Sequence, residues 1–414
     1  MKILKAFKWL YPGMRVKRWS LLAVFGVIMV SMGFVMVIAE QTAKSKTFAA
    51  VIIIIGILGI VTGIKRIIKS FVTILLPQRE GDLVDKVYQR LILEKGPKIV
   101  VIGGGTGLSM LLHGLKEFTS NITAVVTVAD DGGSSGRLRQ DMDVLPPGDI
   151  RNCLVALADA EPLMGKLFQF RFDQGGELKG HNFGNLFITA MSKVTGDFDA
   201  AIKESSKVLA IRGSVVPATL NKVTLVAQHP DGTESVGESN IPKSLKPIKK
   251  ISLRPEGSKP THDAVEAVKK ADAIVLGPGS LYTSIMPNLL IEKLYKEIIA
   301  SKAIKIYVCN VMTQKGETEG YKASDHFKAI VEHTGPGIVD YCIINTAKIH
   351  DAIIGRYEEE GARQVMADTE NLKKMKCKVV EAHILKVKDY VRHDSEKLAK
   401  IIVDLVSSLR KAHV

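Results

Sequence analysis

The sequence predicts an α/β protein in which a mostly parallel sheet carries helices on both faces, with two transmembrane helices in front of it. Three observations predict this class. Short apolar runs typical of buried strands alternate with helical patterns, several of these runs end in glycine-rich or polar loops, and two long uncharged runs stand near the N-terminus. A segment with hairpin character adds a small antiparallel insertion.

The strand–helix alternation begins at residue 98. Residues 98–102 are a continuous apolar run that ends in glycines, residues 108–116 have helical spacing, and residues 122–128 are a second apolar run. Strands of a parallel sheet are apolar along their whole length because helices bury them on both faces. The alternation resumes later, with apolar runs at 273–276, 305–309 and 341–344.

Two further elements follow from local patterns. A β-rich insertion is expected at about 213–245, because residues 223–227, the turn from His229 to Gly232 and residues 233–236 form a hairpin pattern. At the C-terminus, residues 395–410 have an amphipathic helical pattern, which Asp394 or Ser395 is expected to cap.

The charge of the chain is unevenly distributed. Residues 1–79 hold twelve Lys and Arg residues and one acid, a net of +11, which leaves +3 of the total +14 for residues 80–414. The basic character therefore belongs to the N-terminal segment, and a nucleic-acid partner is not expected. The four cysteines form no C-x-x-C pair, which indicates structural thiols in a reduced cytosolic domain.

Residues 20–39 and 47–64 are the two uncharged runs, of twenty and eighteen residues. As helices that rise about 1.5 Å per residue, each covers roughly 27–30 Å, so both are expected to span a membrane. A cleaved signal peptide is the competing interpretation of the first run. It is disfavoured because the apolar stretch is too long, Ala39 ends a poor cleavage site, and a second run follows at once.

The flanking charges predict the orientation of these helices. Basic residues crowd both outer flanks, whereas the connecting loop holds only Lys44 and Lys46 with Glu40. The positive-inside rule places both chain ends and the main domain in the cytoplasm. We expect a membrane anchor at 1–80, a linker helix at 81–97 and the α/β domain at 98–414. Gly59 and Gly63 can let the two helices approach closely or support a homodimer, and the alternative is that their spacing reflects composition alone.

The loop after the first strand, residues 103–107, is rich in glycine. Such a loop lets the backbone approach a phosphate, whose charge the N-terminus of the next helix favours. Leu108 stands in place of the third glycine of the dinucleotide fingerprint, so a ligand cradle and a simple tight turn are both open interpretations. The candidate ligand-binding residues are Gly104, Gly105, Thr106 and Gly107.

The loop after the second strand, residues 130–139, is more informative. Two adjacent carboxylates can hold Mg²⁺ or a pair of ribose hydroxyls. The backbone N–H groups of the Gly-Ser stretch can form an anion-binding nest, and two arginines can each donate two hydrogen bonds to a phosphate. A solvated polar loop is the alternative. The candidate residues are Asp130, Asp131, Gly133, Ser134, Ser135, Arg137 and Arg139.

Two further motifs stand where helices are expected to begin. In residues 146–152, capping is the preferred role of Asp149, while Arg151 and Asn152 can face the ligand crevice. In residues 180–185, Asn182 and Asn185 can offer donors to a ligand. His181 is a candidate catalytic base, although a lone histidine is more often structural.

Later strands end in comparable loops. Residues 277–284 offer backbone amides and hydroxyls for a second anion-binding loop. Residues 310–318 add polar side chains to the same sheet edge. Arg392, near the C-terminal helix, can bring a positive charge to a phosphate. Cys309 is taken as structural because it lacks an evident activating base. The candidate residues are Gly277, Gly279, Ser280, Thr283, Asn310, Thr313 and Arg392.

Taken together, these loops resemble the YvcK (gluconeogenesis factor) branch of the CofD-like superfamily. The motifs that carry the resemblance are GGGTG, TVADDGGSSGRLR, PPGDIRN, GHNFGN, GPGSLYTS and NVMTQKGET. The similarity runs from about residue 98 to the C-terminus, and the DDGGSSGRLR stretch is highly specific. The transmembrane hairpin lies outside the minimal form of that family.

The resemblance implies a Rossmann-like domain that binds UDP-sugars such as UDP-N-acetylglucosamine and takes part in cell-shape control and growth on gluconeogenic carbon sources. It also implies Ser/Thr kinases as partners, with Ser395 as a candidate acceptor. The CofD relatives transfer a phospholactyl-type group from a guanosine diphosphate donor to a deazaflavin alcohol. If that activity persisted here, Asp130 and Asp131 would be its Mg²⁺ ligands.

Two classes of function therefore compete: a UDP-sugar sensor read by envelope-synthesis proteins at the membrane, and an active transferase. Binding is favoured, because His181 is the one candidate base and no aromatic cluster stands near the motifs to stack a flavin-like acceptor. A NAD-linked dehydrogenase ranks lower, because the third glycine of the fingerprint is missing.

Overall fold

The computed structural model describes residues 16–39, 42–75, 91–159, 162–359, 361–387 and 391–412. The chain divides into two compact units, Met1–Arg90 and Leu91–Val414, and each is described by itself. The basic flank before residue 16 and residues 81–90 of the expected linker helix lie outside the described residues. Residues 91–94 are helical, and residues 95–98 are not.

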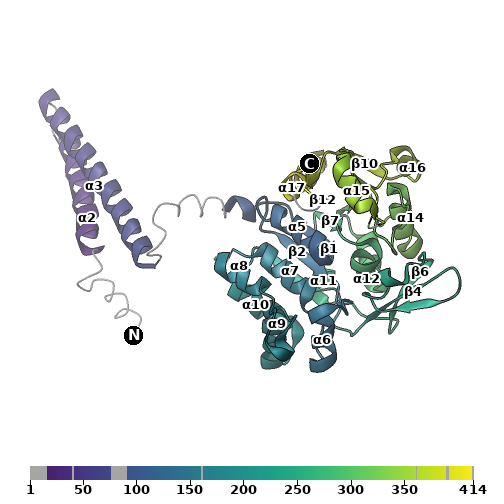
Figure 1. Ribbon diagram of the computed structural model, residues 1–414. Helices are drawn as coiled ribbons and strands as arrows, with labels where there is room; N and C mark the ends of the chain where they lie inside the picture. Colours follow the sequence, from purple (N-terminus) through teal and green to yellow (C-terminus); the bar gives the residue numbers. More distant parts are fainter. Residues whose placement is uncertain are drawn as a thin grey trace. The chain divides into compact units, whose positions relative to one another are not determined.

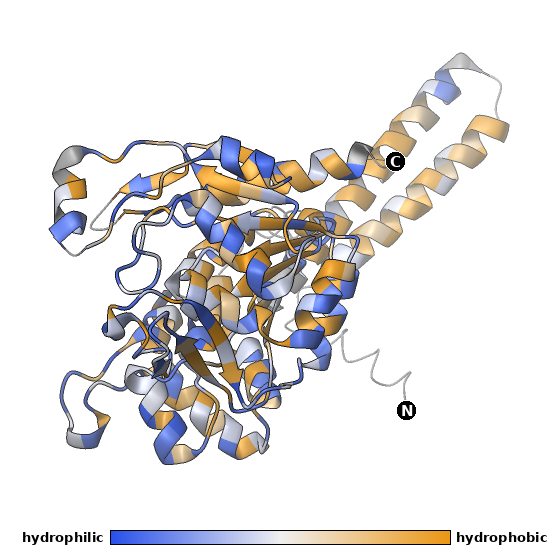
Figure 2. Cartoon of the chain, turned by 90° about the vertical axis from the view of Figure 1, so that its right-hand side faces the viewer, coloured by the Kyte–Doolittle hydropathy of each residue, from blue (hydrophilic) through white to orange (hydrophobic). Residues whose placement is uncertain are grey.

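The first unit consists of two long antiparallel helices, α2 (Val16–Ala39) and α3 (Ala43–Leu75), which lie side by side in Figure 1. Their segments Lys17–Ala39 and Lys44–Ser70 are long and apolar enough to cross a membrane. Hydrophobic residues, coloured orange in Figure 2, dominate both helices, and many of them are exposed. A helix that is apolar on all sides suits a lipid environment better than water.

Glycines bring these two helices into close contact. A β-carbon at Gly26 would lie 2.6 Å from the carbonyl oxygen of Gly56, and one at Gly63 would lie 2.8 Å from that of Trp19. A β-carbon at Gly59 would have its nearest neighbour at 3.6 Å. The close approach expected from the Gly59–Gly63 pair therefore occurs within the chain, and Gly63 is the member that needs it.

The second unit is built on a seven-stranded parallel sheet with the order β10-β9-β8-β7-β1-β2-β3. This confirms the predicted α/β class with a mostly parallel sheet (Figure 1). All five residues of β1 are buried, as expected for a central strand covered on both faces. The strands are β1 (Ile99–Gly103), β2 (Ile122–Val126), β3 (Ser214–Pro217), β7 (Ala273–Leu276), β8 (Ile304–Val308), β9 (Tyr341–Asn345) and β10 (Lys378–Ala382).

Helices cover this sheet on both faces. From β1 the chain steps to β2, and from β7 it steps to β8 in the opposite direction, so right-handed crossovers place the connecting helices on opposite faces. The leucines of α5 are fully buried against the strands. The helices are α5 (Gly105–Leu115), α6 (Gly133–Met142), α7 (Gly148–Leu157), α8 (Pro162–Gln169), α9 (Phe183–Thr195), α10 (Phe198–Leu209), α11 (His262–Lys270), α12 (Met286–Leu289), α13 (Glu292–Ala300), α14 (Ala323–Thr334), α15 (Asp351–Glu359), α16 (Thr369–Lys374) and α17 (Ser395–Ala412). Asp394 caps α17 by accepting the N–H of Lys397 at 3.1 Å.

The insertion is a three-stranded antiparallel sheet of β4 (Thr224–Gln228), β5 (Glu234–Val236) and β6 (Lys250–Arg254). The hairpin of β4 and β5 confirms the prediction, but the expected bounds 213–245 are wrong at both ends. At the start, β3 belongs to the main sheet, because its buried residues pair in parallel with β2. At the end, β6 pairs with β4, and five residues are too short a run to reveal this long-range pairing in the sequence.

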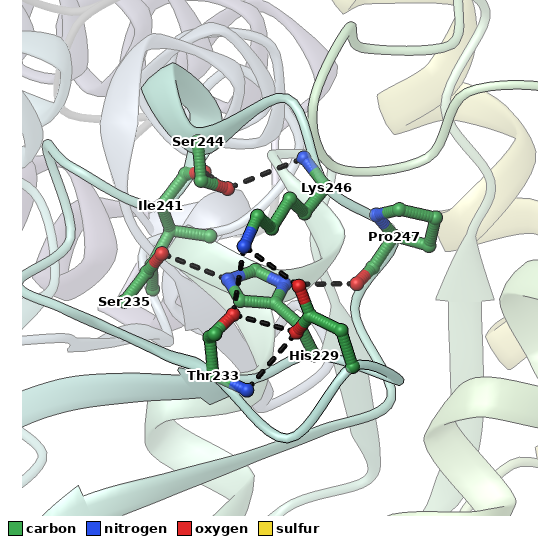
Figure 3. A network of polar contacts seen from close by, with 8 residues as sticks. His229, Thr233, Ser235, Ile241, Ser244, Lys246 and Pro247 are labelled. Carbon is green, nitrogen blue, oxygen red and sulfur yellow. Dashed lines mark hydrogen bonds and ion pairs between the residues drawn. The ribbon is translucent and has the colours of Figure 1, made fainter.

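A buried histidine closes this insertion (Figure 3). His229, 1% exposed, donates from Nδ1 to the carbonyl of Pro247 at 2.9 Å, so its Nε2 is free to accept the hydroxyl of Ser235 at 2.8 Å. Above it, Lys246 bonds Asp231 at 2.7 Å and Thr233 at 2.9 Å. The network ties both ends of the insertion together and fixes the intervening segment, which reaches the crevice described next.

Candidate functional site

The candidate site lies where the strand order reverses. From β1 the chain proceeds to β2 and β3 on one side, while β7 to β10 extend on the other. Open parallel sheets bind ligands beyond the carboxyl ends of the strands at such a point. A cavity of about 430 Å³ lies there. The predicted site residues that line it are Gly104, Gly105, Thr106, Gly107, Gly279, Ser280, Thr283, Asn310 and Arg392.

The first wall of this crevice is the loop between β1 and α5. Gly104 stands at the N-cap position with extended backbone and no side chain to bond the first amides of α5. Gly105 has a φ of +66°, a conformation that glycine adopts without strain. A first helical turn leaves amides without intrahelical partners, so Thr106 and Gly107 can offer theirs to an anion in the crevice.

The second wall is the loop after β7, and it touches the first. A β-carbon at Gly107 would lie 2.7 Å from the carbonyl oxygen of Pro278 and 3.1 Å from the nitrogen of Gly279. Gln314, in the loop after β8, donates from Nε2 to the hydroxyl of Ser280 at 2.8 Å. The two glycine loops form one continuous surface, and a third loop supports it.

Glu317 lies behind this second loop. It is 6% exposed, and its carboxylate accepts the hydroxyl of Thr283 at 3.2 Å and the backbone N–H groups of Tyr282 and Thr283. Burial raises the pKa of Glu317 to about 7, although these hydrogen bonds act in the opposite direction. The acid positions Thr283, which lines the cavity.

Asp149 has a different role from the expected one. It lies within the first turn of α7 and does not cap that helix, whose N-cap residue is Pro147. Its carboxylate instead accepts the backbone N–H of Gly105. Burial, followed by the charge of Asp130, raises the pKa of Asp149 to about 6. The prediction of a helix cap is wrong because α7 begins one residue before Asp149, whose carboxylate bonds a backbone donor far away in the sequence.

Sequence reasoning missed Glu238, an acid that lines the crevice. It comes from the insertion, just after β5. Burial, and then Asp130, Asp149, Asp131 and Glu317, raise its pKa to about 9. The sequence holds no signal for it, because a single Glu in a hairpin segment is unremarkable until the insertion folds over the sheet.

The C-terminal part supplies the last wall. Val391, Arg392 and His393 of β12 (Val391–His393) line the cavity, and β12 pairs with β11 (Leu385–Val387). The backbone N–H of Val391 donates to the hydroxyl of Tyr357 at 2.7 Å. His393 donates from Nε2 to the carbonyl of Cys309 at 3.2 Å, and burial lowers its pKa to about 4. Both neighbours of Arg392 in β12 are therefore held by hydrogen bonds, and His393 is neutral at neutral pH.

Other predicted site residues lie outside the cavity. Arg139 donates to the carbonyl of Val223 at 2.7 Å and so holds the insertion. Thr313 exchanges backbone and side-chain bonds with Arg363. Gly277 begins the second loop with a φ of +78°. The remaining ones gather beside the crevice around α6 and α9, and they are Asp130, Asp131, Gly133, Ser134, Ser135, Arg137, His181, Asn182 and Asn185.

The two adjacent aspartates do not make a metal site by themselves. Asp130 accepts the N–H of Gly132 at 2.9 Å, and Asp131 accepts that of Ser239 at 2.8 Å. Within the described residues, no group of three or more His, Cys, Asp or Glu side chains is arranged to hold a metal ion. Because Mg²⁺ is commonly held by two carboxylates together with substrate phosphates and water, the Mg²⁺ implied by the transferase resemblance stays a prediction, and we derive no step through it.

A larger groove of about 830 Å³ lies at the opposite end of the strands, where Lys98, Ile122 and Ser214 contribute to its walls. None of the predicted site residues lines it. Since ligands of open parallel sheets bind at the carboxyl ends, we assign the site to the smaller crevice.

A family model described as 2-phospho-L-lactate transferase CofD matches residues 99–385. A Bacillus subtilis protein named gluconeogenesis factor is 51% identical over 311 residues, which cover 75% of this chain and 98% of that protein. The chain belongs to the gluconeogenesis factor branch of the CofD-like superfamily.

Similarity within this gluconeogenesis factor branch reaches the N-terminal helices in some members. A relative from Clostridium acetobutylicum is 44% identical over 419 residues, 97% of this chain and 92% of its own. A crystal structure of a Bacillus halodurans protein, 49% identical with a TM-score of 0.74, covers 75% of this chain and 100% of its own. The length of that protein corresponds to the α/β domain, so the helical hairpin is an addition that only part of the family carries.

Proposed function

We propose that the crevice binds a UDP-sugar such as UDP-N-acetylglucosamine and that the protein is a regulator of the gluconeogenesis factor type. The observation that carries this proposal is the contact of the two glycine loops at Gly107 and Pro278. Two glycine loops at the carboxyl ends of neighbouring strands, one at the N-terminus of α5 and one after β7, suit the two phosphates of a nucleotide diphosphate. Arg392 adds a cation to the lining of the crevice.

We further propose that α2 and α3 are a two-pass anchor that holds the domain at the cytoplasmic face of the cell membrane. Their length and apolar composition, together with the basic flanks, support this placement. Envelope-synthesis proteins would then read the UDP-sugar level beside the membrane, in support of cell shape and growth on gluconeogenic carbon sources. Ser395, the first residue of α17, stays a candidate for phosphorylation, and homodimerisation stays a prediction.

A CofD-like transferase that moves a phospholactyl-type group is the second candidate, supported by the family match over residues 99–385. A transferase needs a base beside the donor phosphate. His181 does not line the crevice, and Glu238, which does, is protonated at neutral pH and so is no base. These observations favour binding over turnover.

Isothermal titration calorimetry of the full-length protein in a nonionic detergent tests the proposal. Calorimetry is preferred because the two tryptophans, Trp9 and Trp19, both stand before residue 90 and do not report on the domain. We expect UDP-N-acetylglucosamine to bind and NAD to give no signal. Absence of binding by every UDP-sugar tested contradicts the proposal. Conversion of a labelled guanosine diphosphate donor in the presence of Mg²⁺ and a deazaflavin alcohol would establish the transferase instead.

A further inference from the structure

Three arginines gather beside the crevice without a carboxylate partner. Arg137 donates to the carbonyl of Lys179 at 2.9 Å, and Arg171 donates to that of Gly180 at 2.7 Å. Arg151 donates to the side-chain oxygen of its neighbour Asn152 at 2.6 Å. Each guanidinium thus meets a neutral acceptor, and the described part of the chain forms no ion pair with any of the three.

These cations are close enough to affect one another. Burial, and then the guanidinium of Arg171, lower the pKa of Arg151, while the carboxylates of Asp149 and Asp130 act in the opposite direction. Burial, and then Arg137, lower the pKa of His181, and Arg171 acts in the same direction. Like charges that converge in this way cost free energy unless an anion joins them.

Hydrogen bonds determine which ring nitrogen of neutral His181 carries the proton. Ser134 accepts the N–H of Asn182 at 3.3 Å and the side-chain amide of Asn185 at 3.2 Å. Its hydroxyl proton is therefore free for Nδ1 of His181, 3.2 Å away. The neutral imidazole then carries its proton on Nε2, which makes that atom a donor to a ligand.

The same cluster holds buried polar atoms without partners. Asn185 is 3% exposed, and its side-chain oxygen has no hydrogen-bond partner in the described structure, nor does Nε of Arg151. Both belong to the group around Ser134 and the N-terminus of α9, a helix of thirteen residues. Buried polar atoms are nearly always paired, so a missing partner points to a bound molecule.

We propose that Arg137, Arg151, Arg171 and His181 form a second ligand site that binds the phosphate of a small hydroxylated phosphate monoester. A dianionic phosphate satisfies the guanidinium groups and the Nε2 proton of His181. A hydroxyl of the same ligand donates to the side-chain oxygen of Asn185. The site is separate from the diphosphate crevice, and it touches that crevice through Asp149, which acts on Arg151 and bonds Gly105.

Calorimetric titration of the full-length protein with inorganic phosphate tests this site. We expect binding that persists at saturating UDP-N-acetylglucosamine, and tighter binding of glycerol 3-phosphate, which adds hydroxyls. Arg171→Gln and Arg137→Gln, both on exposed side chains, should each weaken phosphate binding about tenfold.

Arg212→Gln is the matched control, because it removes the same charge from an arginine that is paired with Asp159 at 2.7 Å. It should change phosphate affinity less than twofold. Absence of phosphate binding, equal loss in the control, or displacement of phosphate by the UDP-sugar overturns the second site. Because phosphate is also titrated without UDP-sugar, that titration tests the second site whether or not a UDP-sugar binds in the crevice.

Discussion

Asp149, in the first turn of α7, accepts the backbone N–H of Gly105, where α5 begins. A β-carbon at Gly104 would lie 2.5 Å from the same carboxylate, so loop and acid are in direct contact. The carboxylate holds the glycine loop in place, and its charge competes with a phosphate for the N-terminus of α5.

Separate substitutions distinguish these two effects of Asp149. Asp149→Ala removes the acceptor and should lower the free energy of unfolding by about 1–3 kcal/mol and weaken UDP-sugar binding. Asp149→Asn keeps an acceptor and removes the charge, so stability should largely persist and the diphosphate should bind at least as tightly. Urea denaturation followed by circular dichroism measures the first effect, and calorimetry the second. Equal losses in both variants would show that the charge itself stabilises the loop.

Glu238 predicts a pH-dependent stability. An acid whose pKa is higher in the folded than in the unfolded protein gives stability that is complete below about pH 4.5 and is lost as the pH rises through about 9. Glu238→Gln stays neutral, so it should match the wild type near pH 4.5 and exceed it by on the order of 2 kcal/mol at pH 8. Urea midpoints at both pH values check this. Parallel pH profiles for the two proteins would mean that Glu238 ionises normally.

The contact of the two glycine loops predicts a steric effect on binding. Gly107→Ala places a β-carbon 2.7 Å from the carbonyl oxygen of Pro278, and the loops must move apart. We expect at least a tenfold loss of UDP-sugar affinity. Gly165→Ala in α8 is the control, because its β-carbon meets nothing within 4 Å. It should leave affinity within twofold and raise stability by about 0.4–1 kcal/mol. Unchanged affinity in Gly107→Ala removes the loops from the ligand site.

The fold was predictable because each strand is a short apolar run followed by a loop of distinct chemistry. The β1 and β7 loops could be placed together on one sheet edge for the same reason, since carboxyl ends of parallel strands meet. The roles of Glu238 and Arg139 could not be predicted. Both depend on the insertion, which folds across the sheet through β6, a strand far from its partner in the sequence. Local patterns carry no information on such pairings.

The two arginines of α6 have different roles that their positions in the sequence do not reveal, and their substitution tests this difference. Arg139 bonds the carbonyl of Val223 and the hydroxyl of Thr224, whereas Arg137 is exposed. Arg139→Ala should lower the free energy of unfolding by about 1–2 kcal/mol, because it leaves buried acceptors unpaired. Arg137→Ala should change it by less than about 0.5 kcal/mol. Urea denaturation of both variants decides the matter, and equal effects would mean that Arg139 does not hold the insertion.

The helical hairpin offers a matched pair of substitutions. Gly63→Ala places a β-carbon 2.8 Å from the carbonyl oxygen of Trp19, whereas the nearest atom to one at Gly59 is 3.6 Å away. Only Gly63→Ala should force α2 and α3 apart. The guanidinium of Arg66 lies 5.1 Å from the centre of the Trp19 ring, so this separation should change the Trp19 emission.

The measurement uses the full-length protein in detergent micelles, with Trp9→Phe as background so that Trp19 is the single emitter. We expect a spectral change in Gly63→Ala and none in Gly59→Ala, with the same oligomeric state in both by chemical crosslinking. If both substitutions instead reduce crosslinked dimer to a similar extent, the glycine pair acts between chains. The glycine pair would then serve contact between two copies of the chain, and the dimer would be the unit that any partner at the membrane encounters.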